Sequence, residues 1–269
     1  MFLLVSVLLL INGFVPLAAQ TVGVYGFVGA AARLFGVGLV YYCAGFAMVE
    51  IGRSRDAQQT PANRVDVGVA AICVALALMP LHWLAKGALV PLSAYLIASS
   101  RRESPEWRIG IVLSAIAAAL VLGALLLTAF ATPLLNLDGA LVRLITGASG
   151  AGNIIDTVAR PGSGSIERVV VLADCSSVRN ISQATILWAS MTQLFAVPIT
   201  ARMVRAGGFA MLAIVAINTA RIAAYVYLPQ YYAVLHAETF ASIFGLASLL
   251  SALAIIAWAI LRESSSRPA

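Results

Sequence analysis

Long apolar stretches separated by short polar breaks dominate this chain. A membrane helix needs about 20 mostly apolar residues to cross the hydrocarbon of a bilayer. The pattern supplies eight candidate spans, over residues 2–17, 22–49, 67–84, 88–98, 109–132, 181–197, 209–227 and 240–261. The sequence therefore predicts an all-α fold, a polytopic bundle of about eight transmembrane helices, with residues 1–269 forming a single integral membrane domain.

Basic residues gather in alternate breaks and give the bundle a direction. Short cytoplasmic loops collect Lys and Arg, and Arg53, Arg101, Arg102 and Arg202 all fall in breaks that an even number of spans places on one side. We therefore expect the N-terminus inside. Because no Lys or Arg precedes the first apolar run, we expect that run to be an uncleaved span and not a signal peptide.

Composition supports the same picture. Hydrophobic residues make up 61% of the chain and charged residues 10%, whereas a soluble domain carries about a quarter charged residues. The net charge of +6 is spread over the polar breaks. It therefore indicates topology, and we expect membrane lipid and no nucleic acid among the partners.

The longest polar segment, residues 133–174, is expected on the extracytoplasmic side. Residues 134–146 place Leu and Val at three- and four-residue spacings, which predicts an amphipathic helix at the membrane interface. Residues 147–164 are rich in Gly, Ser and Ala and predict a flexible loop. Residues 166–173 then lead to Cys175, either as an extended segment or as the start of a helix.

The cysteines differ in their surroundings. Cys43 and Cys73 lie inside apolar runs and are expected to be packing residues. No spacing of Cys and His is typical of a metal site, so we expect no metal and no cofactor. Cys175 instead opens a polar stretch between two apolar segments, which makes this unpaired thiol a candidate nucleophile.

The neighbours of Cys175 act on it in opposite directions. A cation or a helix N-terminus favours the thiolate, the reactive form. The carboxylate of Asp174 disfavours it unless a cation compensates. Arg179 follows Cys175 by four residues, which puts both on one helix face if the segment is helical. Asp174, Ser176 and Arg179 are therefore predicted to support a site around Cys175.

Two further groups reach the same membrane face in the predicted topology. Arg221 lies near the outer end of the seventh span, with Asn218 three residues before it on the same face. An ionisable residue at such depth marks a functional site or a specific pairing, and a guanidinium can stabilise an oxyanion. The alternative is an arginine that extends to the outer headgroups.

His236 lies in the short connection before the last span. Imidazole is the side chain best suited to exchange protons near neutral pH. The alternative is an interfacial histidine that follows an aromatic belt, which we expect to contain Tyr225, Tyr227, Tyr231 and Tyr232.

Taken together, these residues resemble a known family. Cys175-Ser176-Ser177 opens a span, Asn218-x-x-Arg221 lies inside the next, and His236 precedes the last. This arrangement is similar to that of the exosortase/archaeosortase family of multipass membrane cysteine transpeptidases. The resemblance covers residues 169–258, whereas the earlier spans match only in hydropathy. Ser177 and Asp174 depart from the family pattern, in which Cys-Ser-Gly and a small residue before the cysteine are usual.

The resemblance implies a role for each residue. Cys175 would be the nucleophile, Arg221 the oxyanion-stabilising or substrate-positioning cation, and His236 the general acid and base. It also implies substrates that end in a sorting motif, a membrane helix and a basic tail, as PEP-CTERM proteins do. Cleavage would pass through a thioester at the outer face of a bacterial inner membrane, and the acceptor could be water, a polysaccharide or a lipid.

Two other classes of function remain open at this stage. In a proton- or anion-coupled transporter of small solutes, Arg221 would bind an anion and His236 would couple protons. In a scaffolding protein of an envelope polysaccharide pathway, Cys175 would be dispensable. The chain shows no internal repeat of the kind that transporter halves often show.

Overall fold

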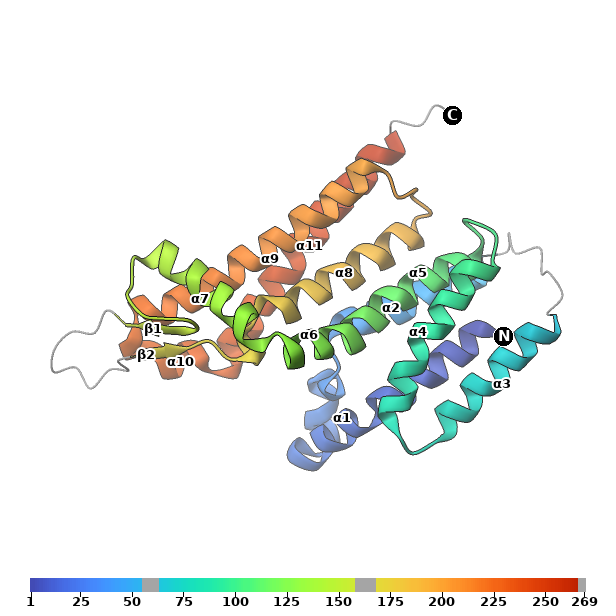
Figure 1. The fold of residues 1–269 in the computed structure, drawn as a ribbon, viewed down its shortest axis with the longest axis horizontal. Helices are drawn as coiled ribbons and strands as arrows, with labels where there is room; N and C mark the ends of the chain where they lie inside the picture. The colour runs from blue at the N-terminus through green and yellow to red at the C-terminus, as the bar shows by residue number, and fades with distance from the viewer. Residues whose placement is uncertain (55–62, 158–167, 266–269) are drawn as a thin grey trace. The chain divides into compact units, whose positions relative to one another are not determined.

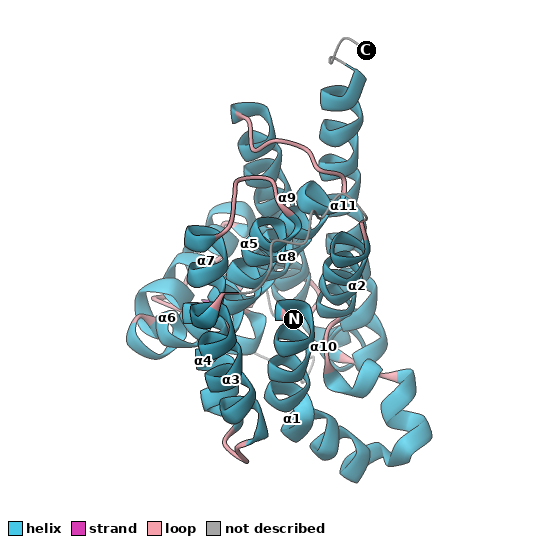
Figure 2. Ribbon diagram, turned by 90° about the vertical axis from the view of Figure 1, so that its right-hand side faces the viewer, coloured by secondary structure: helices cyan, strands magenta, loops and turns pink. Residues whose placement is uncertain are grey.

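The structure is a computed structural model that describes residues 1–54, 63–157 and 168–265. Helices make up most of this part of the chain (Figure 2). A two-stranded sheet accompanies them (Figure 1). The predicted all-α class is therefore confirmed apart from that short sheet. The chain divides into two compact units, residues 1–122 with 186–198 and residues 123–185 with 199–269.

The first unit is built from helices. Asn12 on the first helix donates from its amide to the carbonyl oxygens of Ala77 (2.7 Å) and Met79 (2.9 Å), where the third helix ends. Such side chains satisfy the carbonyls that a helix end leaves without partners. The elements are α1 (Phe2–Ala32), the 3₁₀ turn η1 (Leu34–Gly36), α2 (Leu39–Arg53), α3 (Arg64–Leu78), α4 (His82–Ser99), α5 (Pro105–Ala117), the π-helical turn η2 (Ala118–Leu122) and the last part of α8 (Ser177–Leu194).

Several of the predicted spans have the wrong boundaries. The first, residues 2–17, ends inside α1, which continues to Ala32. The second, residues 22–49, crosses the break between α1 and α2, where Phe35 and Gly36 have φ angles of 53° and 75°. This left-handed conformation ends a helix whatever the hydropathy of its residues, and glycine adopts it without steric cost. The third, residues 67–84, runs past Leu78, where α3 ends. Hydropathy alone does not report such breaks because the residues at them are also apolar.

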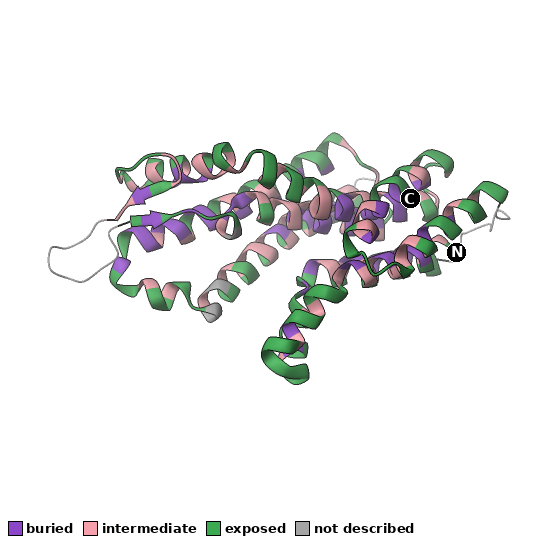
Figure 3. Cartoon of the chain, turned by 60° about the horizontal axis from the view of Figure 1, so that its bottom comes forward, coloured by how far each residue is buried: buried purple, intermediate pink, exposed green. Residues whose placement is uncertain are grey.

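Among the described residues, four helices are long and apolar enough to cross a membrane. They are Phe2–Ala32, Pro105–Ala129, Ala201–Tyr227 and Ser242–Ser265. Figure 3 shows exposed residues along the lengths of the helices, and large apolar side chains such as Phe209, Leu212 and Leu261 are among them. Apolar surface of this kind suits a lipid environment, so the chain is a membrane protein. The finer prediction of eight spans is not confirmed.

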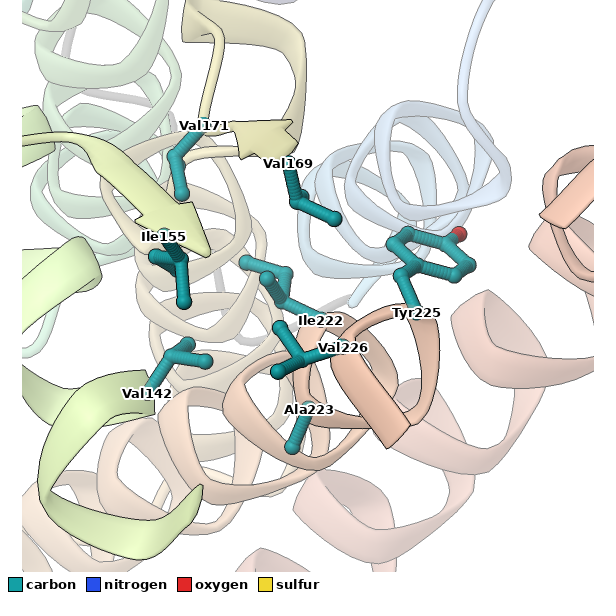
Figure 4. Close-up of a cluster of buried hydrophobic side chains, with 8 residues drawn as sticks. All are labelled: Val142, Ile155, Val169, Val171, Ile222, Ala223, Tyr225 and Val226. Carbon is teal, nitrogen blue, oxygen red and sulfur yellow. The ribbon is translucent and has the colours of Figure 1, made fainter. Parts of the chain in front are cut away.

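The second unit surrounds the C-terminal part of α9. It contains α6 (Gly123–Ala129), α7 (Ala131–Thr146), β1 (Ile154–Asp156), β2 (Arg168–Val170), the 3₁₀ turn η3 (Ala173–Cys175), the first part of α8, α9 (Ala201–Tyr227), the 3₁₀ turn η4 (Pro229–Tyr231), α10 (Tyr232–His236) and α11 (Glu238–Ser265). The core of this unit joins α7, the sheet and α9, as Figure 4 shows, through Val142, Ile155, Val169, Val171, Ile222, Ala223, Tyr225 and Val226. Its apolar side chains thus hold the two strands against helix α9.

The segment before Cys175 is more ordered than its composition predicts. A helix, α7, covers the expected interfacial segment and starts at Ala131; its place at the membrane interface stays a prediction. Part of the expected flexible loop instead forms β1, which pairs antiparallel with β2. Residues 168–170 adopt the extended alternative, while residues 158–167 lie outside the described part. Ile155, buried in the core, explains why this stretch of a Gly-rich segment is held as a strand.

Gly139 on α7 offers a test of this packing. A Cβ atom there would meet the carbonyl oxygen of Gly152 and, at 3.1 Å, the Cα of Asn153. We expect Gly139→Ala to lower the free energy of unfolding by about 1–3 kcal/mol, although alanine is the better helix former. Gly208 on α9 is the matched control because a Cβ atom added there would have nothing within 4 Å. A thermal melt in detergent should show Gly139→Ala below, and Gly208→Ala at or above, the wild-type midpoint.

Candidate functional site

The first turn of α8 is held by a carboxylate from α7. Asp138 is buried, and its Oδ2 accepts hydrogen bonds from the Ser176 hydroxyl and from the backbone N–H of Ser177, both at 3.0 Å. The Ser176 hydroxyl oxygen also accepts from the N–H of Val178 at 3.2 Å, as an N-cap residue does. A negative charge is favourable at the positive end of a helix dipole. Asp138 therefore fixes the backbone directly after Cys175.

Helix α9 holds the same segment from another side. Asn218 is buried, and its side-chain amide donates to the carbonyl oxygen of Cys175 at 2.8 Å and to the hydroxyl of Ser177 at 3.2 Å. The N–H of Cys175 donates to the carbonyl of Leu172 at 2.9 Å, which closes η3. The structure thus brings Asn218 to Cys175. It contacts the backbone of the candidate nucleophile.

The Cys175 side chain is half-buried and packs against the core of the second unit. That core includes Ile222 and Tyr225 of α9, which lie one and two turns after Asn218. The Asp174 side chain lies outside the described part of the structure, and so does its predicted compensation by Arg179. Arg179 itself is exposed on the first turn of α8.

Arg221 is bound through one edge of its guanidinium. Its Nε donates to the hydroxyl of Tyr225 at 2.8 Å, and that hydroxyl donates in turn to the carbonyl of Leu235 at 3.3 Å. His236 follows Leu235 at the end of α10 and is exposed. Its ring stacks on Tyr232 (centroids 5.1 Å apart) and lies 6.0 Å from the ring of Tyr225. Arg221 and the segment of His236 are therefore connected through Tyr225.

Sequence reasoning missed two residues of this arrangement. The sequence did not single out Asp138, and Tyr225 was assigned to an aromatic belt. The belt assignment is wrong for Tyr225, since only 3% of its surface is exposed and its hydroxyl bridges two groups. The signal for Tyr225 was its spacing of four residues from Arg221, which puts both on one helix face. No comparable local signal pointed to Asp138, whose partners lie 38 and 39 residues away.

The predicted catalytic residues Cys175, Arg221 and His236 lie on η3, α9 and α10 and do not bond to each other. Asn218, Arg221 and Tyr225 follow at spacings of three and four residues along α9. In the part of the chain that the structure describes, no hydrogen bond joins Cys175 directly to Arg221 or His236. Catalytic hydrogen bonds are often completed only when substrate is bound. The structure connects Cys175 to α9 through Asn218, and Arg221 to the segment of His236 through Tyr225.

Comparison of the chain with protein-family models, with curated proteins and with solved structures finds no match. The chemistry of the site is therefore argued from its own residues. The polar contacts that matter most connect α7, η3, α8 and α9, all through residues of the second unit.

Replacing Asp138 should loosen the segment of Cys175. Asp138→Ala removes the acceptor of two buried hydrogen bonds, so we expect a loss of about 1–3 kcal/mol in the free energy of unfolding and faster alkylation of Cys175 by a maleimide. Asp138→Asn keeps an oxygen acceptor and should have a smaller effect on both. The control is Asp156→Ala, which removes the partner of Arg168 in a more exposed ion pair, where the expected loss is at most about 1 kcal/mol. Equal alkylation rates for Asp138→Ala and wild type would contradict this anchoring role.

Proposed function

We propose that this chain is a membrane-embedded cysteine peptidase or transpeptidase of the exosortase/archaeosortase kind, which cleaves C-terminal sorting signals of exported proteins. The observation that carries the proposal is the hydrogen bond from the buried Asn218 amide to the Cys175 carbonyl. It brings the motif Asn218-x-x-Arg221 to the one cysteine that lies in a polar turn. Packing alone does not require such a bond, because an apolar pair would fill the same space without buried polar groups.

The reaction would proceed by acyl transfer. The Cys175 thiol gives its proton to His236, and the sulfur attacks the scissile peptide carbonyl. The tetrahedral intermediate carries its negative charge next to Arg221. It collapses to a thioester on Cys175 as the C–N bond breaks, and His236 returns the proton to the leaving amine, which carries the C-terminal membrane helix. Water or an acceptor hydroxyl or amine then attacks the thioester and frees the thiol.

The assignment of Arg221 to the oxyanion follows from what occupies the other donors. A helix N-terminus can stabilise an oxyanion through its free N–H groups. At the start of α8, however, the N–H of Ser177 already donates to Asp138 and that of Val178 to Ser176. Within the described residues, Arg221 donates only through its Nε, to the Tyr225 hydroxyl. It is therefore the better candidate for the developing charge.

The setting proposed for this reaction is the extracytoplasmic face of a bacterial inner membrane. The distribution of basic residues supports an N-terminus inside the cell, which would put Cys175 and His236 outside. A substrate helix would lie in the bilayer beside the protein, with its scissile bond just beyond the apolar core. Polysaccharide or lipid acceptors are accessible on that side.

Loss of the thiol should abolish processing. In cells that co-express a reporter ending in a PEP-CTERM-like sorting segment, we expect Cys175→Ala to stop cleavage, whereas Cys43→Ala, the same chemical change in α2, should leave it unchanged. The measurement is the ratio of full-length to shortened reporter. Mass spectrometry should find the reporter attached to Cys175 by a bond that neutral hydroxylamine cleaves. Cleavage that continues at the wild-type rate in Cys175→Ala would exclude the nucleophile.

Removing the cation should slow the chemical step. Loss of one oxyanion donor lowers kcat by about 10²–10³-fold in other enzymes, and we expect Arg221→Ala to fall in that range without loss of folded protein. Arg205→Ala is the control because Arg205 is exposed at the other end of α9. Solute flux into proteoliposomes that needs Arg221 and survives Cys175→Ala would instead support a transporter.

A further inference from the structure

The Tyr225 hydroxyl occupies an unusual place in the second unit. It is buried in the core with Val169 and Ile222, yet it accepts a hydrogen bond from a charged group and donates one to a backbone carbonyl. A buried hydroxyl needs one partner to offset its desolvation. The Leu235 carbonyl alone would meet that need, so the second bond, to Arg221, has to be explained by what it does to the guanidinium.

The bond to Tyr225 fixes how Arg221 can act. A guanidinium is planar and rigid, with one edge at Nε and another formed by its two terminal amino groups. Tyr225 engages Nε, and the Arg221 Cζ lies 5.8 Å from the centre of the Tyr225 ring. Among the residues that the structure describes, the terminal amino groups of Arg221 have no hydrogen-bond acceptor. They remain available to an oxygen atom of a bound peptide.

The Tyr225 hydroxyl also contacts the segment that carries His236, the proposed proton carrier. It donates to the carbonyl of Leu235, the residue before His236. The rings of Tyr225, Tyr232 and His236 also lie against one another, with Tyr225 and Tyr232 5.5 Å apart at an angle of 65°. One side chain of α9 thus contacts Arg221 on its own helix and the chain next to His236 on α10.

We propose that Tyr225 is a positioning residue, whose hydroxyl sets the orientation of the Arg221 guanidinium and ties it to the segment that carries His236. The inference rests on the proposed function, since it assigns Tyr225 to the same reaction. Tyr225 does not touch the substrate; it acts through Arg221. A substrate carbonyl attacked by Cys175 would then find the terminal amino groups of Arg221 held in place before the oxyanion forms, which is how preorganised donors contribute most to a rate.

The test is Tyr225→Phe, which removes one oxygen atom and keeps the buried ring. With the intact protein in proteoliposomes and the PEP-CTERM-like reporter as substrate, we expect kcat to fall about 10- to 100-fold, the range of a hydrogen bond to a charged group. KM should change less than about twofold, because an interaction made in the transition state is lost. Tyr227→Phe is the control: its hydroxyl also donates to a backbone carbonyl, that of Thr146, but on an exposed side chain of the same helix.

Measuring Tyr225→Phe in the Arg221→Ala protein distinguishes a positioning role from a general loss of packing. If Tyr225 acts through Arg221, then Tyr225→Phe should change kcat by less than about twofold when Arg221 is already alanine. A wild-type rate in Tyr225→Phe, or an equal fold loss in the Arg221→Ala background, would overturn the proposal.

Thermal melts of the wild type, Tyr225→Phe, Arg221→Ala and the double variant test the contact between Tyr225 and Arg221 independently of the proposed function. The two single variants should each lower Tm, and the double variant should lower it no further than the larger single effect, because both remove one hydrogen bond. Additive shifts would contradict the coupling whether or not the reporter is cleaved. A wild-type protein that cleaves nothing but shows the coupled shifts would contradict the peptidase and leave the contact between Tyr225 and Arg221 supported.

Discussion

The arrangement of the second unit depends on the hydrogen bond between the Asn218 amide and the Cys175 carbonyl. Cys175 ends a single 3₁₀ turn between a three-residue strand and a helix, a segment too short to define its own position. The bond joins residues 43 positions apart, and the Asn218 side chain that donates it is buried. Leaving a buried donor without its acceptor costs about 1–3 kcal/mol. That cost opposes any displacement of the turn along α9, and Asp138 applies the same constraint from α7.

The helices of the first unit were largely predictable because long apolar stretches can be recognised in the sequence. Their ends were not. The break at Phe35 and Gly36 lies among apolar residues and depends on backbone angles that hydropathy does not contain. Strand β1 was hidden for a related reason: three residues give too short an alternation to be read, and only the pairing of Ile155 with Val169 makes the segment a strand.

The site was predictable where its signals were local. Cys175 stood out through its polar surroundings, and the spacing of Asn218 and Arg221 placed both on one face of a helix. Asp138 and Tyr225 were not found, because the role of each depends on partners that lie on other elements. A carboxylate in an apolar helix and a tyrosine near a membrane surface both have ordinary interpretations. Only the fold shows that the first caps the helix after Cys175 and the second bridges Arg221 and Leu235.

The backbone of the candidate site is held more tightly than the side chains that it carries. The backbone at Cys175 is bound by Asp138 and Asn218 and has little room to adapt. The side chains that would react in the proposed mechanism are less constrained: Cys175 is half-buried, His236 is exposed, and Arg221 keeps its terminal amino groups unoccupied within the described structure. If thiol, guanidinium and imidazole were bonded to each other in advance, those bonds would have to break before a substrate could bind. Under the proposed function, fixed supports and open reacting atoms would avoid that cost, since each new hydrogen bond would form to the substrate.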